Sequence, residues 1–327
     1  MKYRPFSDLG WNISEVGLGC WQIGWCWGDV SETDSRDILK EAVNNGVNFF
    51  DTSDMYGDGR SEKLIGDMIK STKEKIYVTT KLGRRTRGTN YNKGFKEEHM
   101  EEFIDRSLKN LGIECIDLVQ LHCPPLDIIA NEETHKNMDD LIKKGKIANY
   151  GVSVHNISDA MEAIKFRNIK SIQIVFNIFR QRPAELLFEE AKKKKVAIIA
   201  RGPLASGLLT GDINMNTKFA ENDHRNYNIN GEYFDVGDTF SGVKFEKGLE
   251  AVNELKKILP EEYTLADLAL KWILMHDAVS VVIPGAINKT QVIKNIKSSE
   301  LPNISSLLEK ISLIYEDLIK PDVHHRW

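Results

Sequence analysis

The chain has 327 residues, of which 41% are hydrophobic and 28% are charged, a composition typical of a globular protein that can bury a large core. Its formal net charge of -4 provides no positive field for a phosphate backbone, so we expect no nucleic-acid partner. The N-terminus lacks the apolar core of a signal peptide and no stretch is apolar enough to span a bilayer, which predicts a cytoplasmic protein without a membrane partner.

The N-terminal residues 2–14 predict a hairpin whose turn carries Asp8 and Gly10, placed at the floor of the fold. Eight short apolar runs rich in β-branched residues follow it, beginning at Val16, Phe49, Ile76, Ile116, Ile147, Ile172, Val196 and Val279. Segments of helical period lie between most of these runs, as in residues 35–45, 97–111, 264–276 and 290–296.

Apolar strands that alternate with amphipathic helices predict a parallel sheet covered by helices, and eight such units favour an eight-stranded β/α (TIM) barrel over an open sheet. Residues 211–245, after the seventh strand, are rich in Asn, Asp and Gly with scattered aromatics and predict a long lid loop. No linker divides the chain, so we expect a single domain over residues 1–327. The four cysteines lack the paired spacing of a zinc site, which predicts reduced thiols and no metal.

Polar residues follow three successive strands, where a β/α barrel builds its active site. Asp51 ends the second strand and precedes Tyr56 on the next loop, Lys81 ends the third strand and His122 ends the fourth. Taken singly, the Asp could cap a helix, the Lys could be a rim charge and the His could be a core residue. Because all three are expected at the same end of the barrel, a catalytic role is favoured over these separate explanations.

The chemistry of these four residues suits carbonyl reduction or its reverse. A buried Lys81 needs an anionic partner, which Asp51 on the adjacent strand can supply. A phenol with an ordinary pKa near 10 needs a nearby cation to act as a general acid or base, and Lys81 is that cation for Tyr56. His122, expected to be neutral, would donate a hydrogen bond to the substrate oxygen.

These motifs resemble the aldo-keto reductase family over essentially the whole chain. The segment DTSDMYGDGRSEKLIG carries the family's Asp and Tyr, VTTKLG carries its Lys, and DLVQLHCPP carries its His and Pro. The resemblance implies a catalytic tetrad of Asp51, Tyr56, Lys81 and His122 on an eight-stranded barrel. It also implies a nicotinamide cofactor bound without a Rossmann loop, in agreement with GLGCWQIG, where Gln22 replaces the third glycine of that motif. The loop ARGPLASG is similar to that of a bacterial branch of the family.

The resemblance also implies a set of cofactor contacts. Ser153 and Gln173 would bind the carboxamide, although Val154 stands where the family often has Asn, and Arg201 would stack on the nicotinamide. The complete implied set is Trp21, Ser153, Gln173, Arg201, Gly202, Leu204, Ser206, Gly207, Gly285, Ala286, Lys289, Gln291 and Asn295. We expect NADP(H) because members of the family more often use it, with NAD(H) as the alternative. Lys289 is taken as the nearby cation.

The substrate is expected to be a small carbonyl or alcohol: an aldehyde, a ketone or a keto sugar. Its pocket would be built from Trp21, Trp25, Trp27, Tyr56, His122, the loop after His122, the lid and the C-terminal residues 321–327. The indoles could stack on a sugar or could pack the barrel rim. Two alternatives stay open: a cofactor-binding regulatory module resembling potassium-channel β subunits, and a dehydrogenase that oxidises an aldose or inositol. The chain could act as a monomer or a homo-oligomer.

Overall fold

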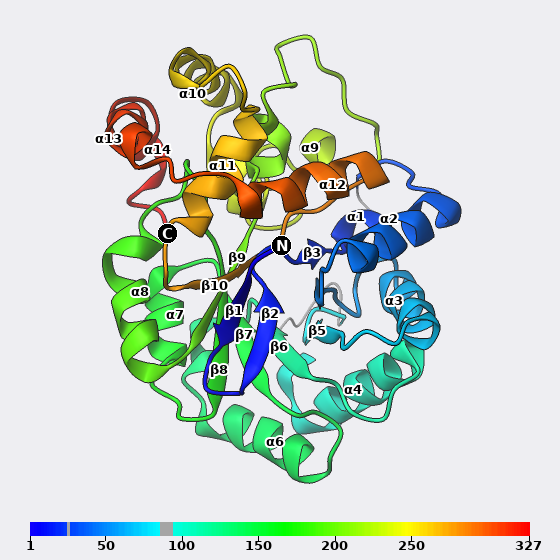
Figure 1. Ribbon diagram of the computed structural model, residues 1–327. Coiled ribbons are helices and arrows are strands. Elements are labelled where there is room, and N and C mark those ends of the chain that lie inside the picture. Colours follow the sequence, from blue (N-terminus) through cyan, green and yellow to red (C-terminus); the bar gives the residue numbers. More distant parts are fainter. Residues whose placement is uncertain (25–26, 86–93) are drawn as a thin grey trace.

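The computed structural model describes residues 1–24, 27–85 and 94–327 (Figure 1). Eight parallel strands pair with their neighbours in chain order. They are β3 (Leu18–Gly19), β4 (Phe49–Asp51), β5 (Tyr77–Leu82), β6 (Leu118–His122), β7 (Tyr150–Ser153), β8 (Ile169–Val175), β9 (Ala197–Arg201) and β10 (Val279–Val282).

The first strand region also pairs with the last, which closes the sheet. The backbone N–H of Gly17 donates to the carbonyl of Val282 at 2.9 Å, and that of Gly19 donates to the carbonyl of Pro284 at 3.0 Å. These bonds pair the first and last strands with each other and leave the sheet without an open edge. The predicted eight-stranded β/α barrel is therefore confirmed.

Helices surround the strands (Figure 1). In chain order they are α1 (Trp21–Gly24), α2 (Glu32–Asn44), α3 (Arg60–Ser71), α4 (Glu97–Leu111), α5 (Leu126–Ile129), α6 (Glu132–Lys143), α7 (Ile157–Ala163), α8 (Pro183–Lys194), α9 (His224–Tyr227), α10 (Phe245–Ile258), α11 (Leu265–Leu274), α12 (Lys289–Lys297), α13 (Ser305–Ile314) and α14 (Lys320–Val323). Local signals set their ends: α11 begins at a capping box in which Thr264 and Asp267 bind each other's backbone N–H groups. Among the described residues, none of these helices has both the length and the apolarity of a membrane span.

The N-terminal hairpin plugs the barrel floor, as predicted. Its strands, β1 (Tyr3–Phe6) and β2 (Trp11–Ser14), pair antiparallel and lie across the barrel in Figure 1. Phe6 and Ile13 are fully buried and pack with inward-facing residues of the barrel strands, including Phe49. The hairpin thus seals the amino-terminal end of the barrel and leaves the carboxyl end for the site.

Candidate active site

Groups from the end of β4 and from the loop after it meet at the carboxyl end of the barrel around the ammonium of Lys81, which lies on β5. Its Nζ donates to Asp51 Oδ2 at 2.6 Å, to the carbonyl of Thr52 at 2.8 Å and to the hydroxyl oxygen of Tyr56 at 3.3 Å. The three ammonium hydrogens are therefore all used. Because Lys81 donates to the phenol oxygen, the phenol's own hydrogen is left to point elsewhere, and Tyr56 lines the pocket above it.

Burial and charge act in opposite directions on this pair. Burial acts to lower the pKa of Lys81, but the charge of Asp51 and the contact with Tyr56 outweigh it, so the pKa is raised and the ammonium stays charged. Burial raises the pKa of Tyr56, and Lys81 offsets only part of that effect. The expectation that Lys81 lowers the phenol pKa thus describes one contribution and not the net direction. Tyr56 is held as a protonated phenol, the form that gives a proton.

His122 ends β6 beside the phenol and lines the same pocket. Its ring and that of Tyr56 are nearly perpendicular, with centroids 6.3 Å apart. Burial, followed by the cations of Arg84 and Lys81, holds the pKa of His122 well below its usual range. The imidazole is therefore neutral at physiological pH, as the sequence predicts, and has one N–H to donate.

A chain of side chains links the groups expected at the nicotinamide to Lys81. Ser153 Oγ donates to Gln173 Oε1 at 3.1 Å, and Gln173 Nε2 donates across the barrel to Asp51 Oδ1 at 2.6 Å. All three side chains are buried. A primary amide has two N–H groups and two acceptor positions, so Gln173 retains one of each after these bonds, which matches the needs of a carboxamide ligand.

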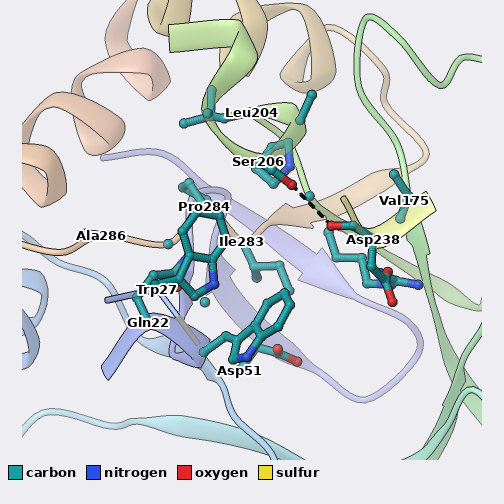
Figure 2. A pocket seen from close by; sticks show the side chains of 18 of the residues that line it. Gln22, Trp27, Asp51, Val175, Leu204, Ser206, Asp238, Ile283, Pro284 and Ala286 are labelled. Atoms are coloured by element: carbon teal, nitrogen blue, oxygen red, sulfur yellow. Dashed lines mark hydrogen bonds and ion pairs between the residues drawn. The ribbon is translucent and has the colours of Figure 1, made fainter. Parts of the chain in front are cut away.

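A pocket of about 600 Å³ extends from this cluster towards α12. Figure 2 shows its walls, with Gln22 and Trp27 facing Pro284 and Ala286, and Leu204 and Ser206 beyond them. Every residue expected to contact the cofactor lines it except Lys289, which lies exposed at the start of α12. Of the expected substrate residues, Trp27, Tyr56 and His122 line the pocket, whereas Trp25 lies outside the described residues.

The lid docks on the loop after β9. Arg201 ends β9 and forms a largely buried ion pair with Asp238 of the lid, whose backbone carbonyl accepts from Ser206 Oγ at 3.2 Å (Figure 2). Burial acts to raise the pKa of Asp238, but Arg201 outweighs it and holds the pKa below its usual range. The predicted lid therefore covers the pocket, and its carboxylate fixes the guanidinium expected beside the nicotinamide.

The C-terminal residues pack on the outside of the lid and do not line the pocket, which corrects the expected role of residues 321–327. The indole Nε1 of Trp327 donates to Asp235 at 3.1 Å, and its ring stacks 3.8 Å from the guanidinium of Arg180. His324 accepts from or donates to Tyr315 at 2.8 Å, away from the barrel mouth. The tail thus supports the lid from behind.

Sequence reasoning did not single out five charged residues that line the pocket: Arg84, Asp212, Arg225, Asp238 and Lys294. Lys294 lies on α12 three residues after Gln291, and this spacing places both residues on one helix face. The spacing could therefore have predicted that Lys294 lines the pocket. Arg225 enters from the lid, where its guanidinium lies 4.7 Å from the ring of Trp27, and Asp238 enters from the same loop. No local sequence pattern predicts where the lid residues lie relative to the pocket.

The pocket fits a nicotinamide dinucleotide. It joins an amide and a hydroxyl at one end to the N-terminus of α12 at the other, and helix N-termini favour phosphate. Between these ends Leu204 has a φ of -105° and Ala205 a φ of 47°, and such a change from right-handed to left-handed backbone forms a concavity of N–H groups that suits an anion. Ser153, Gln173 and Asn295 could hold the two ends of such a cofactor.

Comparison with known proteins agrees with this geometry. Residues 15–312 match the model of the Aldo/keto reductase family. The chain is 30% identical to Aldo-keto reductase YhdN of Bacillus subtilis over 88% of this chain and 85% of that one, and 28% identical to a probable voltage-gated potassium channel subunit beta of Oryza sativa over all of both. The glycerol dehydrogenase AKR11B4 of Gluconobacter oxydans superposes with a TM-score of 0.78 at 25% identity, covering 98% of this chain and 96% of that one. Family members are oxidoreductases that use nicotinamide cofactors, and the chain belongs to the aldo/keto reductase family.

Proposed function

We propose that this chain is an NADP(H)-dependent enzyme that reduces a small aldehyde, ketone or keto sugar, with Tyr56 as the proton donor. The observation that carries the proposal is the contact between Lys81 Nζ and the Tyr56 hydroxyl oxygen at 3.3 Å, with Asp51 behind the ammonium and His122 beside the phenol. This arrangement orients a protonated phenol towards the pocket. We also place the chain in the bacterial branch of the family that carries the ARGPLASG loop.

Each residue has a distinct task in this proposal. His122 donates a hydrogen bond to the carbonyl oxygen and holds it near the phenol. Tyr56 transfers its proton to that oxygen as the alcohol forms, and the ammonium of Lys81 stabilises the phenolate that remains. Asp51 keeps Lys81 charged, while Ser153 and Gln173 orient the cofactor. When bound, the reduced nicotinamide supplies the hydride.

The preference for NADP(H) rests on Lys294, which lines the pocket from the last turn of α12. In this proposal the lysine binds the extra phosphate on the adenosine ribose, which NADP(H) has and NAD(H) lacks. Trp21, Trp27 and Phe234 line the substrate end, and indole faces favour the C–H faces of a sugar or polyol.

Two alternatives have support in particular relatives. The similarity to a probable potassium channel subunit beta is consistent with a cofactor-binding regulatory module. The similarity to a glycerol dehydrogenase is consistent with oxidation of a polyol, an aldose or inositol. The complete proton-transfer cluster favours turnover over regulation, and the raised pKa of Tyr56 favours reduction.

A turnover assay separates these functions. The purified protein is mixed with NADPH and a panel containing 4-nitrobenzaldehyde, glyceraldehyde and keto sugars, and the loss of NADPH is followed. The same protein is given NADP⁺ with glycerol, aldoses and inositol. Reduction of carbonyls faster than oxidation of alcohols is expected. Tight NADPH binding without turnover of any compound would favour the regulatory module.

A further inference from the structure

Ser53 lies between His122 and a buried carboxyl group that the proposed chemistry does not use. Ser53 Oγ is 3.3 Å from His122 Nδ1 and 3.1 Å from Asp54 Oδ1, and it accepts from the backbone N–H of Met55 at 3.2 Å. Ser53 and Asp54 are fully buried, and His122 is 8% exposed. These groups therefore have little access to water, so the hydrogen bonds between them weigh on the protonation state of each.

The hydrogen-bonding capacity of Ser53 limits how they can do so. A hydroxyl has one hydrogen and two lone pairs, and the N–H of Met55 occupies one lone pair. One hydrogen and one lone pair remain for Asp54 and His122. If Asp54 is ionised, it must accept the hydroxyl hydrogen, so His122 donates from Nδ1. If Asp54 is protonated, it can donate to Ser53, whose hydrogen then goes to Nδ1 of His122.

The two arrangements give different tautomers of a neutral imidazole. With its hydrogen on Nδ1, His122 presents a lone pair at Nε2, which cannot donate to a carbonyl oxygen. With its hydrogen on Nε2, it can donate from the ring nitrogen that does not contact Ser53. We propose that Asp54, acting through Ser53, is a positioning residue that selects the tautomer of His122 and enables its Nε2–H to bind the substrate oxygen when Asp54 is protonated. The effect on turnover rests on the function proposed above, whereas the tautomer does not.

The surroundings of Asp54 place this switch near neutral pH. Burial, and next the charge of Glu62 on α3, raise the pKa of Asp54 to about 7. Arg85, after β5, opposes this shift, but its guanidinium contacts the backbone carbonyl of Asp54 at 3.3 Å and forms its ion pair with Asp58 at 2.6 Å. His122 on β6 stays neutral because burial and nearby cations lower its pKa. Asp54 Oδ2 is buried and has no hydrogen-bond partner among the described residues, and an unpartnered oxygen costs less on a neutral carboxyl group than on a carboxylate. The acid hydrogen then lies on Oδ1, beside Ser53.

Nitrogen NMR of the protein labelled with ¹⁵N-histidine tests the tautomer without cofactor, substrate or turnover. The chain has eight histidines, and the spectrum of His122→Gln identifies the signals of His122. As the pH rises through about 7, the protonated nitrogen is expected to change from Nε2 to Nδ1 without formation of an imidazolium. A tautomer that stays the same over this range would overturn the proposal, even for an active reductase.

Kinetic variants test the consequence, with 4-nitrobenzaldehyde and NADPH as probes. In the wild type, kcat is expected to fall about tenfold per pH unit above the Asp54 pKa, as for any single required proton. Asp54→Asn keeps an N–H donor towards Ser53 at every pH, so this fall should disappear. Glu62→Gln removes the charge that raises the Asp54 pKa, so the fall should begin at lower pH. A merely structural role would change kcat and leave the shape of the pH profile intact, and that result would contradict the proposal.

Asp67→Asn provides the matched control, because Asp67 lies exposed on α3, outside this cluster. Its pH profile should equal that of the wild type. If no variant, nor the wild type, reduces any carbonyl, the proposed function fails, while the NMR result still decides whether Asp54 sets the tautomer.

Discussion

Gln173 on β8 donates to Asp51 on β4 across the barrel, with 2.6 Å between Nε2 and Oδ1. The other carboxylate oxygen of Asp51 accepts from Lys81 at the same distance. The Asp51 carboxylate therefore links Gln173, which is proposed to bind the nicotinamide, to Lys81, which is proposed to stabilise the phenolate of Tyr56. The residues proposed for cofactor binding and for proton transfer share a buried hydrogen-bond network, in which removal of one member leaves other groups unsatisfied.

Replacement of Gln173 should consequently impair both functions of the network. Gln173→Leu is expected to raise the Kd for NADPH and to lower kcat, each by ~10-fold, because buried polar partners are left unsatisfied. Fluorescence titration and steady-state kinetics give the two quantities. Ser153→Ala is the control, since it removes the bond to Gln173 and leaves that to Asp51 in place, so only the Kd should rise. An unchanged kcat in Gln173→Leu would show that the link to Asp51 has no role in turnover.

The ion pair between Arg201 and Asp238 should control release of the cofactor. Asp238→Asn breaks a largely buried pair between the lid and β9, and loss of one partner of such a pair costs up to roughly 3 kcal/mol because a charge is left uncompensated. We expect NADPH to dissociate at least ~10-fold faster in stopped-flow displacement. Glu232→Gln, an exposed change in the same loop, should leave the rate unchanged. Equal rates in both variants would rule out lid docking through Asp238.

The barrel and its polar cluster could be predicted from the sequence because both depend on local patterns. Strand alternation gives the barrel, and the ends of successive strands deliver Asp51, Lys81 and His122 to one edge. The network through Gln173 could not be predicted, because it joins residues far apart in the chain across the barrel. The net pKa of Tyr56 depends on how completely the fold buries it, which spacing does not reveal.

The lid and tail mark the limit of sequence reasoning for a different reason. The composition of residues 211–245 predicts a lid, but no periodicity predicts that Asp238 meets Arg201 or that Arg225 meets Trp27. The sequence analysis places the tail in the pocket, whereas in the structure Trp327 packs against Arg180 behind the lid.

Two of the three lysines of α12, Lys289 and Lys294, should differ in their effect on cofactor choice. Both side chains are exposed, but Lys294 lines the pocket and Lys289, at the start of the helix, does not. Lys294→Ala is expected to raise the Kd for NADPH by ~10-fold and to leave that for NADH within ~2-fold, because a phosphate contact is lost. Lys289→Ala should change neither value, as isothermal titration can measure. If only Lys289→Ala lost affinity for NADPH, the phosphate would be bound by Lys289, as expected from the sequence, and not by Lys294.

Asp54 should make the fold less stable as the pH rises. Its pKa is about 7 in the folded protein, and 3.8 is the ordinary value expected in the unfolded chain. Between these two pH values the folded protein therefore binds more protons than the unfolded chain. The free energy of unfolding contributed by this group therefore falls as the pH rises through that window, by roughly 4 kcal/mol for about three pH units.

Asp54→Asn removes this titration and isolates it from that of other groups. Urea unfolding at about pH 5 and about pH 8, on either side of the Asp54 pKa, should show the variant gaining stability relative to the wild type at the higher pH. A stability difference that is the same at both values would mean that Asp54 does not carry a proton in the folded state.

The most direct measurement of the central claim is single-turnover reduction of 4-nitrobenzaldehyde by the NADPH complex of Tyr56→Phe. The substitution keeps the ring that stacks on Trp21 with centroids 6.0 Å apart, and removes only the hydroxyl that contacts Lys81. If Tyr56 gives the proton, the rate of reduction should fall by ~100-fold or more while the Kd for NADPH stays within ~2-fold. A rate within ~3-fold of the wild type, with the cofactor bound, would contradict Tyr56 as the proton donor.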